Sequence, residues 1–144
     1  MVLAIASVAY FTVHAWRTVT YGIPEAYAAW DCATLAIEFM DTHDGAWPKS
    51  WDDLFSAAQT MTNGTRVLRG QSAGNIEVIS DLTRVVWDAD TQGLLNVKDE
   101  DVALRSPVIT RPDGKAFEPV WADAEPNAMI WDYLKTRSVT GGPR

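Results

Sequence analysis

The stretch that decides the fold is YAAWDCATLAIEFMDTHDGAWPKSWDDL, residues 27–54. Its first half carries apolar side chains around most of a helical circumference, and its second half carries turn and helix-start residues. Pro24 can open this helix, because proline is tolerated in a first helical turn. A helix that is apolar over so wide an arc has to be covered by other elements on most sides. We therefore expect residues 24–43 to form the central helix of the domain.

One narrow stripe of this helix is polar, with spacings of three, four and three residues between Asp31, Thr34, Glu38 and Asp41. Such spacings place the four side chains on one face. Acidic side chains on one face can hold a metal ion, but a face in contact with water is the far commoner arrangement. We interpret the stripe as the solvated face of the helix.

A corner comes after the helix. Gly45 stands where a left-handed residue ends a helix, and Trp47-Pro48 turns the chain. Ser50 and Asp53 have the spacing of a capping box, in which the hydroxyl accepts from a backbone amide and the carboxylate reaches back. The sequence predicts a short helix over residues 51–59, with Asp52 and Asp53 at its positive end.

The N-terminal segment is strongly apolar. From Val2 to Trp16 the only ionisable side chains are those of Tyr10 and His14, and Arg17 closes the run. This length falls short of the ~20 residues that cross a bilayer, and residues 1–23 reach it if Arg17 extends its side chain to the interface. We expect these residues to form a single-pass membrane anchor. A signal peptide with a small-residue cleavage site at 13–15, or a buried core helix, are the alternatives.

Residues 2–60 resemble the major pseudopilins of type II secretion, in which a long apolar helix runs into an amphipathic one and then into a Gly-aromatic-Pro turn. Here that turn reads Asp44-Gly45-Ala46-Trp47-Pro48. The segment is also similar to small membrane-anchored bacterial proteins with a Trp-Pro-x-Ser-Trp-Asp-Asp-Leu turn. The prepilin cleavage glycine, the Phe-Thr-Leu-Ile-Glu run and a glutamate within the apolar segment are missing. The resemblance therefore implies shape and membrane context, and not assembly into a secretion pseudopilus.

The sequence predicts mixed α and β structure for the C-terminal part. Residues 76–80 and 84–87 are rich in β-branched side chains and are expected to be strands. Residues 105–110 and 116–121 flank the Pro-Asp-Gly turn at 111–115 and are expected to form a hairpin. A last helix begins near Glu125, and residues 138–144 are expected to be a flexible tail. The fold class expected is α+β, with a single domain over residues 24–137.

Composition narrows the function. The 144 residues carry a net charge of −7, which disfavours nucleic-acid binding because phosphates would be repelled. Cys32 is the only cysteine, so the chain holds neither an intrachain disulfide nor a multi-cysteine metal site. Cys32 and His43 would be about 16 Å apart along one helix, too far for a catalytic dyad. With no other catalytic pattern present, we do not expect an enzyme.

The most specific candidate site is the acidic segment 88–99. It matches the oxygen-ligand positions of an EF-hand or dockerin loop, with candidate calcium ligands Asp88, Asp90, Gln92 and Asp99. Gln92 supplies a neutral ligand, and no strong helix precedes the segment. The simpler interpretation is a strand that turns into a short helical segment.

The tryptophans give a third hypothesis. An exposed group of them could bind a carbohydrate or peptide, but turns and strands also need apolar anchors. We expect Trp87, Trp121 and Trp131 to lie between the sheet and the central helix. The function expected overall is a non-enzymatic, membrane-anchored bacterial domain outside the cytoplasm that acts through protein contacts, with the calcium module and the tryptophan-lined binder as alternatives.

Overall fold

The computed structural model describes the backbone of residues 2–61, 68, 76–117 and 125–140, and side chains from Tyr10 onward except at positions 100 and 103. In chain order its elements are α1 (Val2–Arg17), the π-helix η1 (Thr18–Gly22), α2 (Ile23–Thr42), α3 (Trp51–Thr60), α4 (Ile76–Leu82), β1 (Arg84–Val85), α5 (Thr91–Leu94), α6 (Asp99–Arg105), β2 (Ile109–Thr110) and α7 (Pro126–Thr140).

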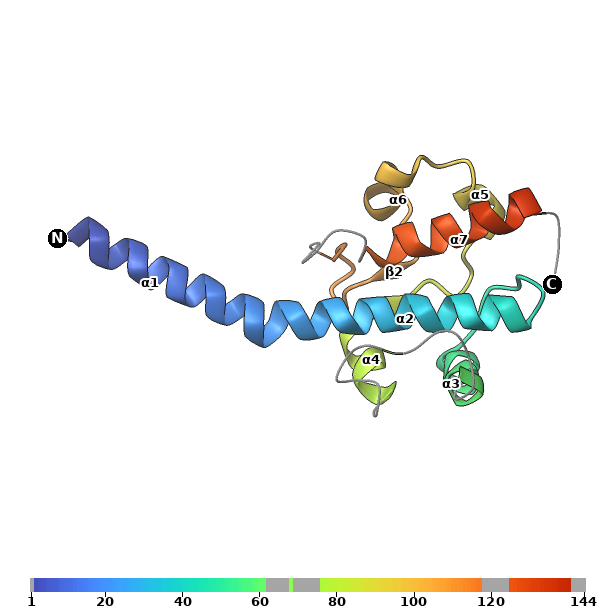
Figure 1. The fold of residues 1–144 in the computed structure, drawn as a ribbon, viewed down its shortest axis with the longest axis horizontal. Coiled ribbons are helices and arrows are strands. Elements are labelled where there is room, and N and C mark those ends of the chain that lie inside the picture. Colours follow the sequence, from blue (N-terminus) through green and yellow to red (C-terminus); the bar gives the residue numbers. More distant parts are fainter. Residues whose placement is uncertain (1, 62–67, 69–75, 118–124, 141–144) are drawn as a thin grey trace.

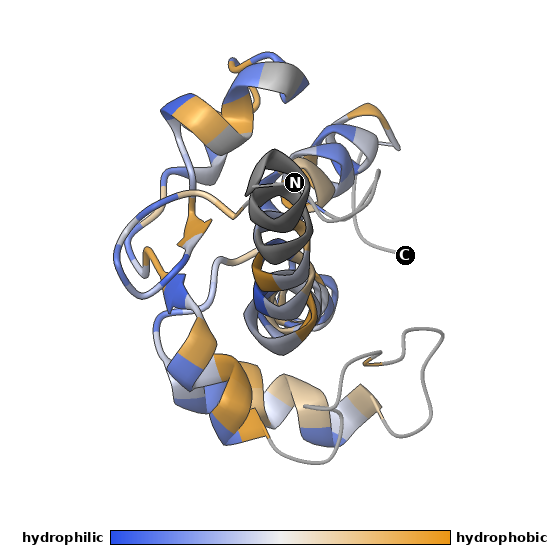
Figure 2. Cartoon of the chain, turned by 90° about the vertical axis from the view of Figure 1, so that its left-hand side faces the viewer, coloured by the Kyte–Doolittle hydropathy of each residue, from blue (hydrophilic) through white to orange (hydrophobic). Residues whose placement is uncertain are grey.

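The fold is α+β and is built around α2. Helices α3, α4 and α7 and strand β2 all pack on this helix, and α6 packs on α7 (Figure 1). Viewed along its axis, α2 has the other elements grouped around it (Figure 2). The prediction that a widely apolar helix is covered on most sides is therefore confirmed. We refer to everything from α2 to α7 as the body.

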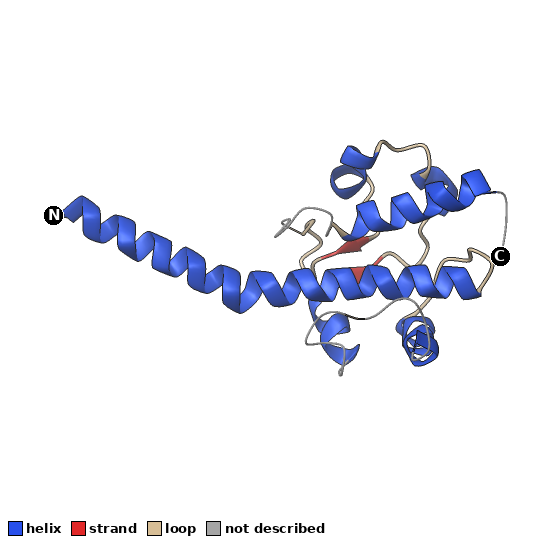
Figure 3. Ribbon diagram, in the orientation of Figure 1, coloured by secondary structure: helices blue, strands red, loops and turns tan. Residues whose placement is uncertain are grey.

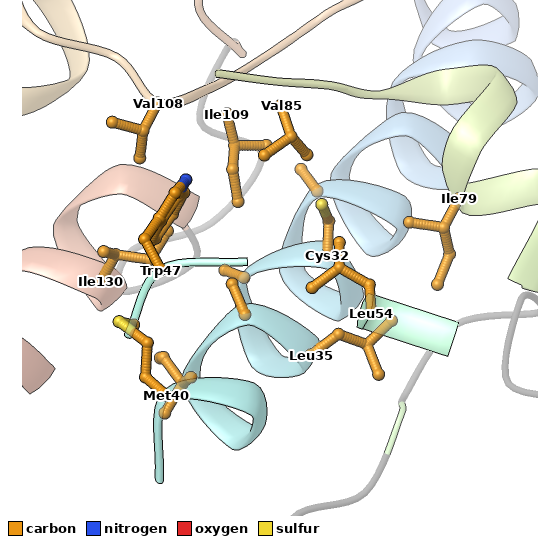
Figure 4. Close-up of a cluster of buried hydrophobic side chains, with 14 of the residues drawn as sticks. Cys32, Leu35, Met40, Trp47, Leu54, Ile79, Val85, Val108, Ile109 and Ile130 are labelled. Carbon is orange, nitrogen blue, oxygen red and sulfur yellow. The ribbon is translucent and has the colours of Figure 1, made fainter. Parts of the chain in front are cut away.

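The core lies along α2. Its largest fully buried side chains include Leu35 and Met40 of α2, and Leu54, Ile79 and Ile130 from α3, α4 and α7, which approach them from different directions (Figure 4). Five buried alanines on α2 favour the helix and allow neighbouring backbones to approach closely. Each element around α2 thus contributes apolar area to a single cluster.

The predicted corner is present. The Ser50 hydroxyl accepts a hydrogen bond from the amide of Asp53 at 3.4 Å, and the Asp53 carboxylate accepts one from the amide of Lys49 at 2.7 Å. Gly45 has φ +83° and donates its amide to the carbonyl of Met40 at 2.7 Å. A glycine in the left-handed conformation follows the end of α2, and a serine caps the start of α3, as the local sequence indicates.

The sheet is smaller than expected. Strands β1 and β2 pair antiparallel, with Arg84 opposite Thr110 and Val85 opposite Ile109 (Figure 3). The predicted strand at 76–80 is wrong, because this segment is helix α4. Its apolar residues at 76, 79 and 82 recur with helical spacing, and Ile79 is fully buried in the cluster on α2. Packing on α2 therefore outweighs the strand preference of β-branched side chains.

The predicted hairpin pairing is not present among the described residues. The turn itself forms, since the amide of Arg111 bonds the carbonyl of Lys115 at 2.9 Å. However, β2 pairs with β1, residues 115–117 are not in a strand, and most of 105–108 is the end of α6 and its exit. Residues 118–121, with Trp121, lie outside the described residues.

A buried asparagine joins the last helix to the sheet. The Asn127 side-chain oxygen accepts from the amides of Val108 and Ile109 at 2.7 and 2.9 Å, and its nitrogen donates to the Ile109 carbonyl at 3.0 Å. The side chain thereby bonds the backbone at β2 in the way that a neighbouring strand would. Helix α7, which contains Asn127, runs to Thr140, so residues 138–140 are helical and not part of a flexible tail as expected. Residues 141–144 lie outside the described residues.

Candidate functional site

The most unusual surface of the molecule is the helix that precedes the body. Helix α1 and η1 project away from the domain as a continuation of α2 (Figure 1). Among the described residues, the extensive contacts of α1 are with η1 alone. Six of the nine exposed large apolar side chains described lie here, namely Tyr10, Phe11, Val13, Trp16, Val19 and Tyr21, each at least 59% exposed. The alternative of a buried core helix is therefore wrong for this part of the segment.

The side chains described on α1 contact one another rather than the body. The Tyr10 and His14 rings stack with an interplanar angle of 2° and centroids 6.0 Å apart, and Tyr10 meets Phe11 edge to face. These rings form one apolar and aromatic surface that the rest of the described chain leaves uncovered. Across the described residues, no helix combines the length and the hydropathy that crossing a membrane requires.

The junction between α1 and the body is a π-helical turn, which the sequence did not predict. The amide of Ile23 bonds the carbonyl of Thr18, five residues back, at the end of η1. The Thr18 hydroxyl bonds the carbonyl of His14 at 3.0 Å. Gly22-Ile23-Pro24 is compatible with either a new helix or a kink in a continuous one, and the structure has the continuous helix. Isolated π turns are rare and often mark functional positions.

The calcium-loop residues have other local roles. The Asp90 carboxylate accepts a hydrogen bond from the amide of Gln92 at 3.1 Å and caps α5, which begins inside the segment. Asp99 is the first residue of α6, and Asp88 lies in the turn after β1. Within the described residues, no group of three His, Cys, Asp or Glu side chains is placed to hold a metal ion. Calcium binding by Asp88, Asp90, Gln92 and Asp99 stays a prediction.

Cys32 is a core residue. It is fully buried, and burial raises the pKa of its thiol to about 12 although the Thr83 hydroxyl bonds it. His43 lies at the exposed end of α2, where its ring stacks on Phe39 with centroids 3.9 Å apart. A thiol that resists ionisation is a poor nucleophile.

The polar stripe of α2 is solvated only in part. Glu38 is partly exposed and Asp41 exposed, but Asp31 and Thr34 are buried at the end nearer η1. The interpretation of the whole stripe as a solvated face is therefore wrong for its first half. The elements that pack on α2 reach further around it than the width of the apolar arc indicates.

The exposed end of the stripe belongs to a cluster that sequence reasoning missed. The Tyr133 hydroxyl donates to the Asp41 carboxylate at 2.6 Å and accepts from Arg137 at 3.2 Å. Partial burial, and then the bond to Asp41, raise the pKa of the Tyr133 hydroxyl. The cluster fastens the C-terminal end of α2 to α7. Its partners are 92 residues apart in sequence, so no local pattern could indicate it.

The described tryptophans of the body serve mainly as anchors. The Trp47 ring is buried, and its indole nitrogen donates to the Val86 carbonyl at 2.8 Å. Trp131 donates likewise to the Val97 carbonyl at 2.8 Å. Trp51 and Trp87 are partly buried and meet edge to face, with centroids 5.4 Å apart. Trp87 packs on the core, whereas Trp131 reaches toward the segment between α5 and α6 instead of the sheet.

The chain matches no known protein family, and no curated protein or solved structure is significantly similar to it.

Proposed function

We propose that the chain is a membrane-anchored, non-enzymatic domain that lies outside the cytoplasm of a bacterial cell and acts through protein contacts. The observation that carries the anchor is the group of six exposed apolar side chains between Tyr10 and Tyr21 on a helix that projects from the body. Apolar patches of this kind on a folded chain mark surfaces that meet lipid or protein.

Lipid is the partner that this surface fits best. The exposed apolar side chains at positions 10, 11, 13 and 16 point in several directions around the helix, as a helix surrounded by acyl chains requires. No acidic residue precedes Glu25, and Arg17 is the only lysine or arginine before it. Both features lower the free energy of transfer into hydrocarbon.

The non-enzymatic part of the proposal is supported by the chemistry of the body. Its cysteine is buried and hard to ionise, and its described histidine is engaged with a neighbouring ring. Two of its polar clusters, those of Asn127 and Tyr133, fasten one element to another. Contact surfaces, rather than a reaction centre, are what this arrangement offers.

Vesicle flotation tests the anchor. The full chain is mixed with phosphatidylcholine vesicles and centrifuged on a density gradient, beside the variants Val13→Asp and Leu104→Asp. Val13 lies on α1 and Leu104 on α6, and they are 59% and 78% exposed. We expect the wild type and Leu104→Asp to float, and Val13→Asp to partition about 100-fold less, because a buried aspartate costs about 3 kcal/mol.

Two results would contradict the anchor. One is a wild-type chain that stays at the bottom of the gradient with the soluble fraction. The other is an equal loss of flotation for both aspartate variants, since this would mean that any added charge, and not charge on α1, controls binding.

A further inference from the structure

The junction between α1 and the body has a composition of its own. Trp16 and Tyr21 are 69% and 61% exposed, and Arg17 lies between them at the end of α1. Indole and phenol rings join an apolar body to a polar edge, so in membrane proteins they gather at the level of the lipid headgroups. An arginine at the same level can reach phosphate oxygens while its methylene groups stay in hydrocarbon.

The backbone of the junction departs from the regular α-helical hydrogen-bond pattern. Pro24 has no amide hydrogen, so it cannot donate to the carbonyl four residues earlier, at Thr20. The π-helical register of η1 shifts the neighbouring bond as well, from Ile23 to Thr18. A helix whose backbone pairing is irregular is tolerated more easily at the lipid headgroups, where water is available, than in hydrocarbon. Thr18 and Thr20 add hydroxyl groups that suit the same depth.

Charge on the body limits the class of lipid. Since Arg17 is the only charged residue before Glu25, residues 25–144 carry a net charge of −8. Glu25, the first of the acids, contacts Arg111 at 3.6 Å, so one cation of the body that lies near the junction is already engaged. A body of this charge is repelled by anionic headgroups within a Debye length of the surface.

From these observations we propose that Trp16, Arg17, η1 and Tyr21 form an interfacial belt that lies at the headgroup level of a zwitterionic lipid bilayer. This inference rests on the proposed membrane anchor and adds the depth of the chain and the class of lipid. The belt sets the level at which the helix leaves the bilayer, so the body begins at the membrane surface without a spacer.

Spin labels on introduced cysteines test the depth. Cys32 is fully buried, so labels attach selectively to the exposed cysteines of Val13→Cys, Thr20→Cys and Ser56→Cys. On phosphatidylcholine vesicles, accessibility to oxygen and to a water-soluble nickel chelate reports the depth of each label. We expect position 13 in hydrocarbon, position 20 at the headgroups and position 56, on α3, in water. A label at 20 that matches either of the other two on vesicle-bound protein would overturn the belt and leave the anchor intact. A chain that does not bind vesicles overturns both.

Two substitutions at Trp16 separate the belt from general hydrophobicity. Trp16→Ala should weaken partition of the chain into vesicles by roughly tenfold, because about half of the free energy gained by burying a large ring is lost. Trp16→Leu keeps an apolar side chain without the polar edge. It should bind within about twofold of the wild type while the label at position 20 moves deeper. An unchanged depth in Trp16→Leu would show that the ring does not position the helix.

The lipid class has its own test. Raising the fraction of phosphatidylglycerol in the vesicles should lower binding of the wild type, and added salt should restore it. Arg17→Glu should weaken binding to phosphatidylcholine more than the charge-matched Lys49→Glu, whose exposed side chain lies beyond the far end of α2. Stronger binding to anionic vesicles would overturn the zwitterionic assignment, and equal effects of the two substitutions would overturn the place of Arg17 in the belt.

Discussion

Helices α1 and α2 are two parts of one continuous helix, both mainly apolar, and they have opposite environments. On α2 twelve residues are buried by the helices and strand around it, whereas on α1 every described side chain is exposed. Apolar sequence thus indicates that a helix avoids water, but it leaves open whether protein or lipid covers it. The difference arises from the corner at residues 44–53, which turns the chain back along α2, while no described element folds back along α1.

The largest expected effect in this comparison comes from truncating one large apolar side chain on each helix. Leu35→Ala on α2 should lower the free energy of unfolding by about 2–5 kcal/mol, because it opens a cavity in a fully packed site. Phe11→Ala on α1 should change it by less than about 0.5 kcal/mol, as expected for an exposed position. Denaturant unfolding of both variants in mild detergent measures this, and equal losses would mean that α1 belongs to the folded core.

The next largest effect concerns the contact between α7 and strand β2 in the body. Asn127→Ala leaves the buried amides of Val108 and Ile109 without their acceptor, so we expect a loss of about 2–4 kcal/mol. The exposed Asn96→Ala serves as the control and should be nearly neutral. The same unfolding curves measure both, and a loss below about 1 kcal/mol at position 127 would show that the sheet holds without the asparagine.

Burial of the α2 cysteine makes the stability of the body depend on pH. Burial raises the pKa of the Cys32 thiol to about 12, so between pH 9 and 12 the unfolded chain loses this proton while the folded chain keeps it. Stability must therefore fall as pH rises through this range, by on the order of 1 kcal/mol between pH 8 and 10. Urea midpoints of the wild type and Cys32→Ala measure the difference, since the Tyr133 titration is common to both. Parallel pH profiles would contradict the burial.

The smallest effect is at the corner that makes the chain fold back. Ser50→Ala removes the acceptor for the Asp53 amide at the start of α3 and should cost about 1 kcal/mol. Ser56→Ala, at an exposed position within α3, should be neutral or slightly stabilising, because alanine is the better helix former. If the two variants have the same melting temperature, the cap contributes nothing to the corner.

Local chemistry explains which parts of the fold the sequence could predict. Gly45, Ser50 and the Pro-Asp-Gly turn act within a few residues of themselves, and their structures result from their own backbone requirements. The apolar arc of α2 is equally local, so the central helix was predictable. Together these local elements were enough to predict the α+β fold class.

The parts that could not be predicted depend on distant partners. Segment 76–80 has the side chains of a strand, but Ile79 completes the core cluster as part of a helix. Asp31 is buried although it continues a polar stripe, and Asn127 pairs with backbone that lies 18 and 19 residues away. For the candidate site, the apolar character of residues 2–16 was evident, but the π turn that places Trp16 and Tyr21 was not.

Hydrogen exchange of the full chain, with and without phosphatidylcholine vesicles, tests the central claim most directly. Without lipid, the amides of α2 should exchange slowly, and those of α1 should exchange fast because none of the described elements of the body packs on that helix. Vesicles should slow exchange in α1 selectively and leave α2 unchanged. Slow exchange of α1 without lipid, or fast exchange of α1 on vesicles, would contradict the account.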